Sequence, residues 1–381
     1  MADHSSSMPG SEHHLVSDAN RQSVPPELAK LREGIDEVDQ QIIALLQQRA
    51  GFAHAVGEFK KTIGAPVYRP EREAQILAKL GEAAVVGPLK GKALQAIYRE
   101  VISACRELER CMKVAYLGPP GTFSEIAALQ HFGAGIEAVP CLSFDEVFRA
   151  AEAGTVDFGV VPVENSSEGA VNRSLDLMLS TTLKICGETS VDVHHSLMTL
   201  AGNMDGITRV CAHPQALAQC VGYLDRNFPS LERIPVSSNA EGARMASQNA
   251  ATAGIASAIA AQRYGLQLVA QSIQDDAVNR TRFAVIGKYE GAASGADQTS
   301  LILSVPDKAG AVHNLIEPLA RHGVSMKRFE SRPARQGNWE YYFYIDLLGH
   351  VSDANVKSAL AEIKQHAAFF KVVGSYPRAL L

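Results

Sequence analysis

The feature that most constrains this chain is a single apolar stripe near its N-terminus. Large apolar side chains recur there at steps of three and four, at Leu28, Leu31, Ile35, Val38, Ile42, Leu45, Leu46, Phe52, Val56 and Phe59. This spacing predicts one amphipathic helix that begins at Pro25-Pro26 and ends near Ile63. Such a helix would be about 57 Å long, whereas a domain of about 90 residues has a radius of gyration of about 12 Å. One copy cannot cover the stripe, so we expect a dimer built on this helix.

The charges on the predicted helices point to an anion site. Arg49 and Lys60 are eleven residues apart and share the apolar side of the first helix. Two cations that face a core need an anion, and Arg32 and Arg72 could add positive charge. Glu109, near the end of the third predicted helix, is the acid available at the other end. The alternative is a set of solvated helix faces with surface ion pairs.

This stretch resembles the all-helical class of chorismate mutases. The family's motif elements read here as Leu31-Arg32-Glu-Gly-Ile35-Asp36-Glu-Val-Asp39, Leu45-Leu46-Gln-Gln-Arg49, Lys60 and Pro66-Val67-Tyr-Arg-Pro-Glu-Arg72-Glu73. The resemblance implies that chorismate is held compactly and rearranges to prephenate in one pericyclic step. Arg49 and Arg32, the latter from either subunit, would hold the substrate carboxylates. Lys60 would donate to the breaking ether oxygen, and Arg72 and Glu73 would contact the rest.

The chain departs from the best-known enteric pattern of that family. Arg69 stands where the pattern has an acid, and Cys105 and Glu109 stand where it has serine and glutamine. Glutamine donates a hydrogen bond at any pH, whereas glutamate donates only when protonated. We therefore expect burial and hydrogen bonding to keep a proton on Glu109, and mutase activity to fall as the pH rises.

Composition excludes several classes of protein. The 381 residues suffice for two or three domains, and the net charge of −5 gives no reason to expect a nucleic-acid partner. No apolar run is long enough to span a membrane, and the polar tail at 1–24 is expected to be disordered. The six cysteines form no C-x-x-C pair, which in a chain of this length is typical of reduced thiols in the cytoplasm.

The central part of the chain has the pattern of an α/β domain. From Lys113 onward, apolar strand-like runs alternate with helices, two of which open at capping boxes that start at Ser143 and Ser238. Such sheets bind ligands at the carboxyl ends of their strands. Polar clusters stand at these ends, at 121–124, 164–169 and 213–215, and a further cluster, 279–282, opens the last strand. A Gly133-Ala-Gly135 stretch mimics a dinucleotide fingerprint but precedes a strand, so we expect no cofactor and no metal.

These clusters resemble those of prephenate dehydratase. The matches are Gly118-Pro-Pro-Gly-Thr-Phe-Ser124, Val161-Pro-Val-Glu-Asn-Ser166, His195-Ser196-Leu197, His213-Pro214-Gln215 and Thr281-Arg282-Phe283. The resemblance implies two subdomains of the periplasmic-binding-protein kind with the site between them. Here they would be 113–192 plus 273–290, and 193–272.

Prephenate must lose carbon dioxide and its ring hydroxyl, so its enzyme needs a donor for the departing hydroxide. The resemblance makes Thr281 that donor, with its proton shared along a hydrogen-bonded network. Substrate-binding or orienting roles are expected for Thr122, Asn165, Ser166, Gln215 and Arg282. For Thr122 and Gln215, loop capping is an equally good alternative, and Arg280 is expected on the surface.

The C-terminal part has the order β-α-β-β-α-β, which is ferredoxin-like. It resembles an ACT domain of the dehydratase type, with motifs at Gly310-Ala311-Val312 and Glu330-Ser331-Arg332-Pro333. ACT domains bind free amino acids, usually between two copies, so the resemblance implies phenylalanine as an inhibitor. A plain dimerisation module is the alternative.

Together these features predict a member of the bifunctional chorismate mutase–prephenate dehydratase family. The expected parts are an all-α three-helix mutase domain, an α/β dehydratase domain and an α+β ACT domain, at 25–112, 113–290 and 299–381, with a linker at 291–298. It would convert chorismate to phenylpyruvate under feedback by phenylalanine, as a homodimer or tetramer. One rival, a mutase fused to prephenate dehydrogenase, lacks its dinucleotide fingerprint. The other rival, a small-molecule sensor, is opposed by the cations on the buried helix face.

Overall fold

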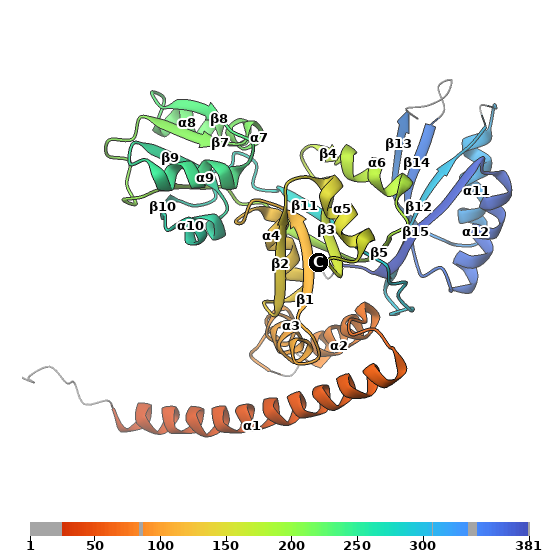
Figure 1. The fold of residues 1–381 in the computed structure, drawn as a ribbon, viewed down its shortest axis with the longest axis horizontal. Helices are drawn as coiled ribbons and strands as arrows, with labels where there is room; N and C mark the ends of the chain where they lie inside the picture. The colour runs from red at the N-terminus through yellow and green to blue at the C-terminus, as the bar shows by residue number, and fades with distance from the viewer. Residues whose placement is uncertain (1–24, 84–86, 307, 334–340, 380–381) are drawn as a thin grey trace, which may run out of the picture. The chain divides into compact units, whose positions relative to one another are not determined.

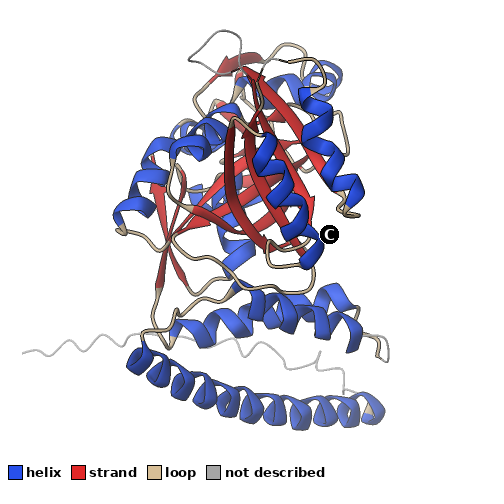
Figure 2. Cartoon of the chain, turned by 90° about the vertical axis from the view of Figure 1, so that its right-hand side faces the viewer, coloured by secondary structure: helices blue, strands red, loops and turns tan. Residues whose placement is uncertain are grey.

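The computed structural model describes residues 25–83, 87–306, 308–333 and 341–379, so the predicted disordered tail lies outside it. Helix α1 (Pro26–Ile63) is one continuous helix, as the apolar stripe predicts (Figure 2). The chain divides between Phe52 and Ala53 into two units, each described by itself. In the first unit the apolar side chains of α1 are exposed.

Two further helices complete the N-terminal region, namely α2 (Pro70–Ala83) and α3 (Gly91–Glu107). They pack on each other through buried side chains such as Leu77 and Ile102. Gln95 of α3 also donates to the Leu77 carbonyl oxygen at 2.9 Å.

The first α/β sheet has the strand order β2-β1-β3-β11-β5, with β4 attached to β3. Its strands are β1 (Met112–Leu117), β2 (Ile136–Cys141), β3 (Phe158–Asn165), β4 (Gly169–Ala170), β5 (Lys184–Asp192) and β11 (Arg280–Gly287). Its helices are α4 (Phe123–Phe132), α5 (Phe144–Ala153) and α6 (Asn172–Ser180). Strands β1, β2 and β3 are parallel, whereas β11 returns antiparallel to both β3 and β5.

The second α/β sheet is inserted between β5 and β11 and has the order β10-β6-β9-β7-β8. Its strands are β6 (Ser196–Thr199), β7 (Arg209–Ala212), β8 (Glu232–Pro235), β9 (Thr252–Ala256) and β10 (Gln267–Ala270). Its helices are α7 (Pro214–Gln219), α8 (Val221–Asn227), α9 (Asn239–Gln248) and α10 (Ala258–Tyr264). Ser238 caps α9, because its hydroxyl accepts from the backbone N–H of Glu241 at 3.0 Å. The Glu241 carboxylate pairs with Arg244 at 2.7 Å, so half of the predicted capping box is formed.

The C-terminal sheet has the order β13-β14-β12-β15, and α11 and α12 cover one of its faces (Figure 1). The elements are β12 (Asp297–Ser304), α11 (Ala311–Arg321), β13 (Met326–Pro333), β14 (Tyr341–Leu348), α12 (Ala354–His366) and β15 (Phe369–Pro377). This is the predicted β-α-β-β-α-β order, and the predicted three-part fold class is confirmed.

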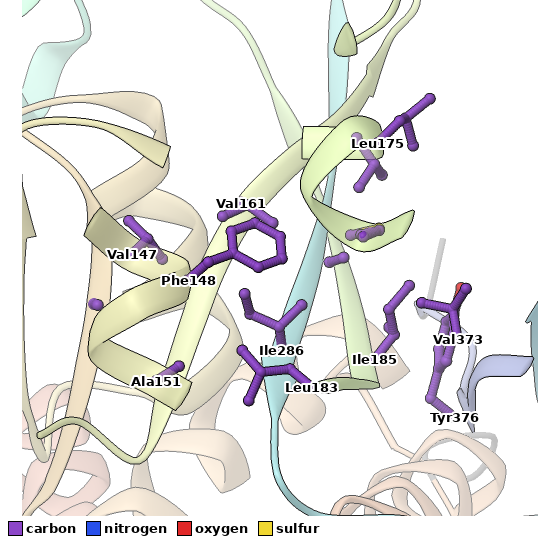
Figure 3. Packing of buried hydrophobic residues seen from close by; sticks show 14 of the residues in the cluster. Val147, Phe148, Ala151, Val161, Leu175, Leu183, Ile185, Ile286, Val373 and Tyr376 are labelled. Carbon is purple, nitrogen blue, oxygen red and sulfur yellow. The ribbon is translucent and has the colours of Figure 1, made fainter. Parts of the chain in front are cut away.

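One hydrophobic core joins the first α/β sheet to the C-terminal sheet. It contains Val161 and Ile286 from the α/β sheet and Val373 and Tyr376 from β15 (Figure 3). Leu175 of α6 belongs to the same core. The two sheets therefore share buried side chains and are not merely joined by a linker.

Candidate active sites and their relatives

Thr281 and Asn165 face each other because of how β11 pairs with β3. The antiparallel pairing places the start of β11 beside the carboxyl end of β3, with Thr281 opposite Asn165. Thr281 is 9% exposed, and its Oγ1 accepts a hydrogen bond from Asn165 Nδ2 at 2.8 Å. Two clusters that are 116 residues apart in sequence thus form one polar site.

The hydrogen-bonded chain continues from Asn165 into the second α/β sheet. Asn165 Nδ2 also donates to Asn279 Oδ1 at 3.0 Å, and Asn279 Nδ2 donates to Gln219 Oε1 at 3.1 Å. His195 Nε2 lies 2.9 Å from the same Gln219 oxygen. The connecting segments run side by side here, since Val193 N donates to Asn279 O and Ile273 N donates to His195 O.

The contacts of Asn165 decide which atom donates and which accepts in each of these hydrogen bonds. Asn165 Oδ1 accepts from the backbone N–H groups of Ser167 and Glu168 at 3.0 and 3.1 Å, so its Nδ2 must be the donor elsewhere. The same reasoning along the chain makes Gln219 Oε1 an acceptor and His195 Nε2 a donor. Thr281 is then an acceptor from Asn165, which leaves its own O–H free to donate to a substrate.

His195 is 2% exposed, and burial lowers its pKa while the Gln219 hydrogen bond opposes that shift. Its Nδ1 and the Nε2 of Gln219 are buried, with no hydrogen-bond partner among the described residues. Sequence reasoning placed His195 in a motif and Asn279 beside Thr281 without assigning either a role, and it missed Gln219. The helical spacing from Gln215 to Gln219, four residues, was the available signal.

Gln215 does not take part in the hydrogen-bonded chain that contains Thr281, and its expected substrate-binding role stays a prediction. Gln215 lies one helical turn before Gln219 on α7, and its backbone N–H is capped by His213 Nδ1 at 3.3 Å. Gln219, not Gln215, joins the Thr281 chain. Thr122 likewise shows the capping alternative, because its hydroxyl donates to Leu117 O at 2.9 Å and accepts from Glu125 N at 3.4 Å.

The Ser166 hydroxyl hydrogen-bonds to the backbone at the start of β11. Its Oγ accepts from Arg280 N at 3.0 Å and donates to Val278 O at 3.3 Å. The side chain of Arg280 is 48% exposed and pairs with Asp192 at 2.8 Å, as expected for a surface residue.

Three carboxylates surround the guanidinium of Arg282, and its expected substrate-binding or orienting role stays a prediction. Its guanidinium lies 2.8 Å from Glu188, 3.2 Å from Glu164 and 2.7 Å from Asp346 of the C-terminal sheet. Burial acts to lower the pKa of Arg282, but Tyr376 and the carboxylates outweigh it and raise that pKa. Arg282 therefore supports the strand that carries Thr281 from the opposite face.

The second predicted site lies at the end of α1. Lys60 Nζ pairs with Glu109 Oε2 at 3.1 Å and donates to Val67 O at 3.0 Å. The two side chains are 19% and 9% exposed. Gly57 makes this contact possible, because a Cβ there would lie 2.6 Å from Glu109 Cγ. Sequence reasoning did not single out Gly57.

Glu73 forms an ion pair with Arg106, in which Glu73 Oε1 lies 2.5 Å from Arg106 Nη1. Burial raises the pKa of Glu73, and the positive charge of Arg106 opposes the shift. Cys105 is buried on α3, and Arg72 is exposed on α2.

Arg32 and Arg49 belong to the unit that ends at Phe52. Arg32 is exposed and Arg49 is partly buried. Of the predicted mutase residues, Lys60 and Glu109 are in direct contact. Both lie in the second unit, whereas Arg32 and Arg49 lie in the first.

The two expected effector motifs lie in the C-terminal region. Gly310 has φ +80° and precedes α11, so its backbone takes the left-handed conformation that favours glycine. Ala311 and Val312 open α11. The second motif, Glu330-Ser331-Arg332-Pro333, ends β13, where Arg332 Nη1 donates to Asp176 and to the Asn172 carbonyl oxygen on α6 at 2.7 and 2.8 Å.

The described residues show neither a group of three His, Cys, Asp or Glu that could hold a metal ion nor a helix suited to crossing a membrane.

Comparison with known protein families assigns each part of the chain. Chorismate mutase type II matches residues 31–110, prephenate dehydratase matches 114–291, and the ACT domain matches 299–365. A bifunctional chorismate mutase/prephenate dehydratase of Neisseria gonorrhoeae is 46% identical over 363 residues, which cover 94% of this chain and 99% of that protein. The Escherichia coli K12 protein of the same name is 31% identical over 375 residues, which cover 92% of this chain and 96% of that protein.

A solved structure supports the same relationship. Prephenate dehydratase from Arthrobacter aurescens, in complex with L-Phe, superposes with a TM-score of 0.65 at 32% identity over 70% of this chain and 90% of that one. Fold and site define an enzyme with a helical part, an α/β part and a ferredoxin-like part. The chain belongs to the bifunctional chorismate mutase/prephenate dehydratase family, and it carries both enzyme activities and an ACT domain.

Proposed function

We propose that this enzyme converts chorismate to prephenate and then to phenylpyruvate, and that phenylalanine inhibits it through the ACT domain. The observation that carries the dehydratase part is the Asn165–Thr281 hydrogen bond of 2.8 Å. Asn165 donates to the Thr281 oxygen, which stabilises negative charge there while Thr281 donates to the departing ring hydroxyl. Carbon dioxide leaves in the same reaction, and aromatisation drives it.

In the mutase part, Lys60 donates to the ether oxygen that breaks, and Glu109 lies beside Lys60 in the same site. Their contact at 3.1 Å supports a shared site. Arg49 and Arg32 hold the carboxylates, and Arg72, Glu73 and Cys105 line the remainder. A pericyclic step needs only positioning and charge stabilisation, so these groups suffice without a covalent intermediate.

Phenylalanine is the proposed effector, and Gly310-Ala311-Val312 together with Glu330-Ser331-Arg332-Pro333 form its site. The left-handed Gly310 at the start of α11 supports this placement, because backbone N–H groups there can receive a carboxylate. The L-Phe complex of the Arthrobacter dehydratase supports the choice of ligand.

The proposed assembly is a homodimer, with a tetramer as the alternative, and ACT domains pair as well. The exposed apolar side chains of α1 support it, for example Leu31 at 67% and Phe59 at 65%. Replacing Ile35 and Ile42 by glutamate should convert the dimer to monomers in analytical ultracentrifugation. An unchanged mass would contradict the proposal.

The proposed domain limits are those inferred from the sequence, 25–112, 113–290 and 299–381, which stay predictions that limited proteolysis would test. The proposed compartment is the cytoplasm. The six cysteines form no disulfide among the described residues, which supports this compartment because disulfides are rare there.

A single-tube assay tests the proposed reactions. Chorismate absorbance should fall first and phenylpyruvate should appear after a lag, with no added cofactor. A requirement for a dinucleotide would favour the dehydrogenase fusion, and binding without turnover would favour the sensor. Added L-phenylalanine should slow the second step, whereas no effect would favour the plain dimerisation module.

A further inference from the structure

Arg282 contacts three carboxylates, and through one of them, Asp346, it connects the dehydratase sheet to the ACT sheet. Glu164 and Glu188 belong to β3 and β5, whereas Asp346 belongs to β14 of the ACT domain. The side chain of Arg282 is 23% exposed, and those of Glu188 and Asp346 are 9% and 6% exposed. A charged contact this far from water is strong and direction-dependent, so each partner constrains the position of the other.

The same strand places this contact one residue from the Thr281 site. In the β11–β3 pairing, Thr281 lies opposite Asn165 and Arg282 lies opposite Glu164. Neighbouring side chains on a strand point to opposite faces. A pull on Arg282 therefore moves the backbone that holds Thr281, without any contact to the Thr281 side chain.

On the ACT side, Asp346 is firmly held by its own sheet. Ser300 Oγ donates to Asp346 Oδ1 at 2.5 Å, and Ser300 is also 2.7 Å from the hydroxyl of Tyr376 on β15. In the β13–β14 pairing, Arg328 lies opposite Asp346 and Glu330 lies opposite Tyr344. The effector motif is therefore on the strand directly beside Asp346.

A second set of contacts holds α6 against the same ACT sheet. Arg332 of the effector motif contacts Asp176 at 2.7 Å, Tyr344 donates to Leu175 O at 3.1 Å, and Lys371 donates to Met178 O at 2.8 Å. Leu175 lies in the core that Val373 and Tyr376 of β15 also enter (Figure 3). Helix α6 closely follows β4, whose Gly169 pairs with Asn165. Both halves of the Asn165–Thr281 pair are thus tied to the ACT domain.

We propose that the Arg282–Asp346 ion pair is the link through which a ligand on the ACT domain changes the dehydratase site. This rests on the proposed inhibition by phenylalanine. A ligand at Glu330–Pro333 competes for Arg332, loosens α6 and shifts β13 with β14. Asp346 moves with β14, Arg282 follows, and Thr281 leaves its alignment with Asn165. A displacement of about 1 Å at a reacting group can lower a rate by about 10²-fold.

The cluster should tolerate loss of the charge on Asp346. Arg282 keeps Glu164 and Glu188 as partners from its own domain. Arg328, whose Nε lies 3.8 Å from Glu164, adds a second cation to the cluster. The cluster contains two arginines and three carboxylates. When Asp346 is replaced by asparagine, two arginines remain with two carboxylates, so the charges balance. We therefore expect Asp346→Asn to fold and to keep its basal dehydratase rate.

The test compares full-length parent, Asp346→Asn and Glu362→Gln. Glu362 pairs with Arg321 and His322 between α11 and α12, so its loss removes an ACT ion pair that does not involve Arg282. Each protein is assayed for prephenate turnover against L-phenylalanine concentration, and L-phenylalanine binding is measured by calorimetry. Asp346→Asn should keep kcat and the Kd for L-phenylalanine within about threefold, while the concentration for half-inhibition rises at least tenfold or inhibition disappears. Glu362→Gln should behave like the parent.

If L-phenylalanine inhibits Asp346→Asn as strongly as it inhibits the parent, the proposed role of the Arg282–Asp346 ion pair is wrong. Loss of L-phenylalanine binding in Asp346→Asn would also overturn it, because Asp346 would then belong to the ligand site. A parent that neither binds nor responds to L-phenylalanine would contradict the proposed regulation itself. If thermal melting shows Asp346→Asn to be unfolded, Asp176→Asn tests the α6 contact with the same two measurements and the same expected split.

Discussion

Asn165 and Thr281 occupy opposed positions on two antiparallel strands, and Asn165 Nδ2 donates to Thr281 Oγ1 at 2.8 Å. Two backbone N–H groups hold the Asn165 oxygen, so the amide cannot turn around without losing both bonds. The threonine proton is therefore directed away from Asn165. This arrangement differs from the expected network in one respect, because amide side chains orient the Thr281 proton but do not relay protons.

Thr281→Val removes the hydroxyl with little change in shape. Dehydratase kcat should fall by about 10²- to 10³-fold, the loss typical of a donor that acts in the transition state. The mutase rate should stay the same, because Lys60 and Glu109 are untouched, and it serves as the internal control. Near-normal prephenate turnover in stopped assays of phenylpyruvate would refute the assignment of Thr281.

Gln219→Leu and Gln215→Leu form a matched pair on one short helix. Gln219 accepts from both Asn279 and His195, so its loss leaves two buried donors without a partner. We expect dehydratase kcat/KM to fall at least tenfold for Gln219→Leu and less than threefold for Gln215→Leu. The opposite ranking would restore Gln215 as the site residue.

Gly57→Ala should impair the mutase selectively. The added methyl group would lie 2.6 Å from Glu109 Cγ, so Glu109 and its contact with Lys60 must shift. Gly51→Ala is the control, since a Cβ at Gly51 would meet no atom of the described residues within 4 Å. Chorismate consumption should fall at least tenfold in the first variant and stay near normal in the second. Equal rates in both would show that the packing at Gly57 is not limiting.

His131 should make the enzyme less stable in mild acid. Burial lowers its pKa from 6.5 to about 3, and its Nε2 lies 2.7 Å from the Tyr68 hydroxyl. Above pH 6.5 the imidazole is neutral in both folded and unfolded chains. As the pH falls from 6.5 toward 3, the unfolded chain binds a proton that folded His131 does not. The free energy of unfolding should therefore fall by up to about 1.4 kcal/mol per pH unit.

Urea unfolding of the parent, His131→Gln and His313→Gln between pH 7 and pH 5 checks this expectation. The slope of stability against pH should be smaller in His131→Gln than in the parent. His313 is exposed, so its variant should keep the parent slope. Identical slopes in all three would contradict the assignment to His131.

Much of the fold was predictable because it depends on local patterns. The stripe of α1 needs only helical periodicity, and the helix cap at Ser238 needs only residues close in sequence. Strand β5 (Lys184–Asp192) and helix α6 were not predicted. Both pack against the ACT sheet, and that burial depends on residues about 190 positions away, such as Lys371.

The candidate dehydratase site was predictable only in part. Thr281 and Asn165 stood in recognisable motifs, whereas Gln219 entered the site because α7 turns that side chain, and not Gln215, toward Asn279. The charge of Arg282 suggested a binding or orienting role, but the sequence did not show that three carboxylates surround its guanidinium.

The sequence by itself determined the helical stripe, the three-part order of the chain and the residue types that suit its two reactions, because periodicity and motif spacing are local properties. Tertiary structure alone decided which of those residues meet. The antiparallel return of β11 placed Thr281 beside Asn165 and turned Arg282 toward Asp346. Strand direction and register depend on the packing of distant elements, and a shift of one residue would exchange the two faces of the strand.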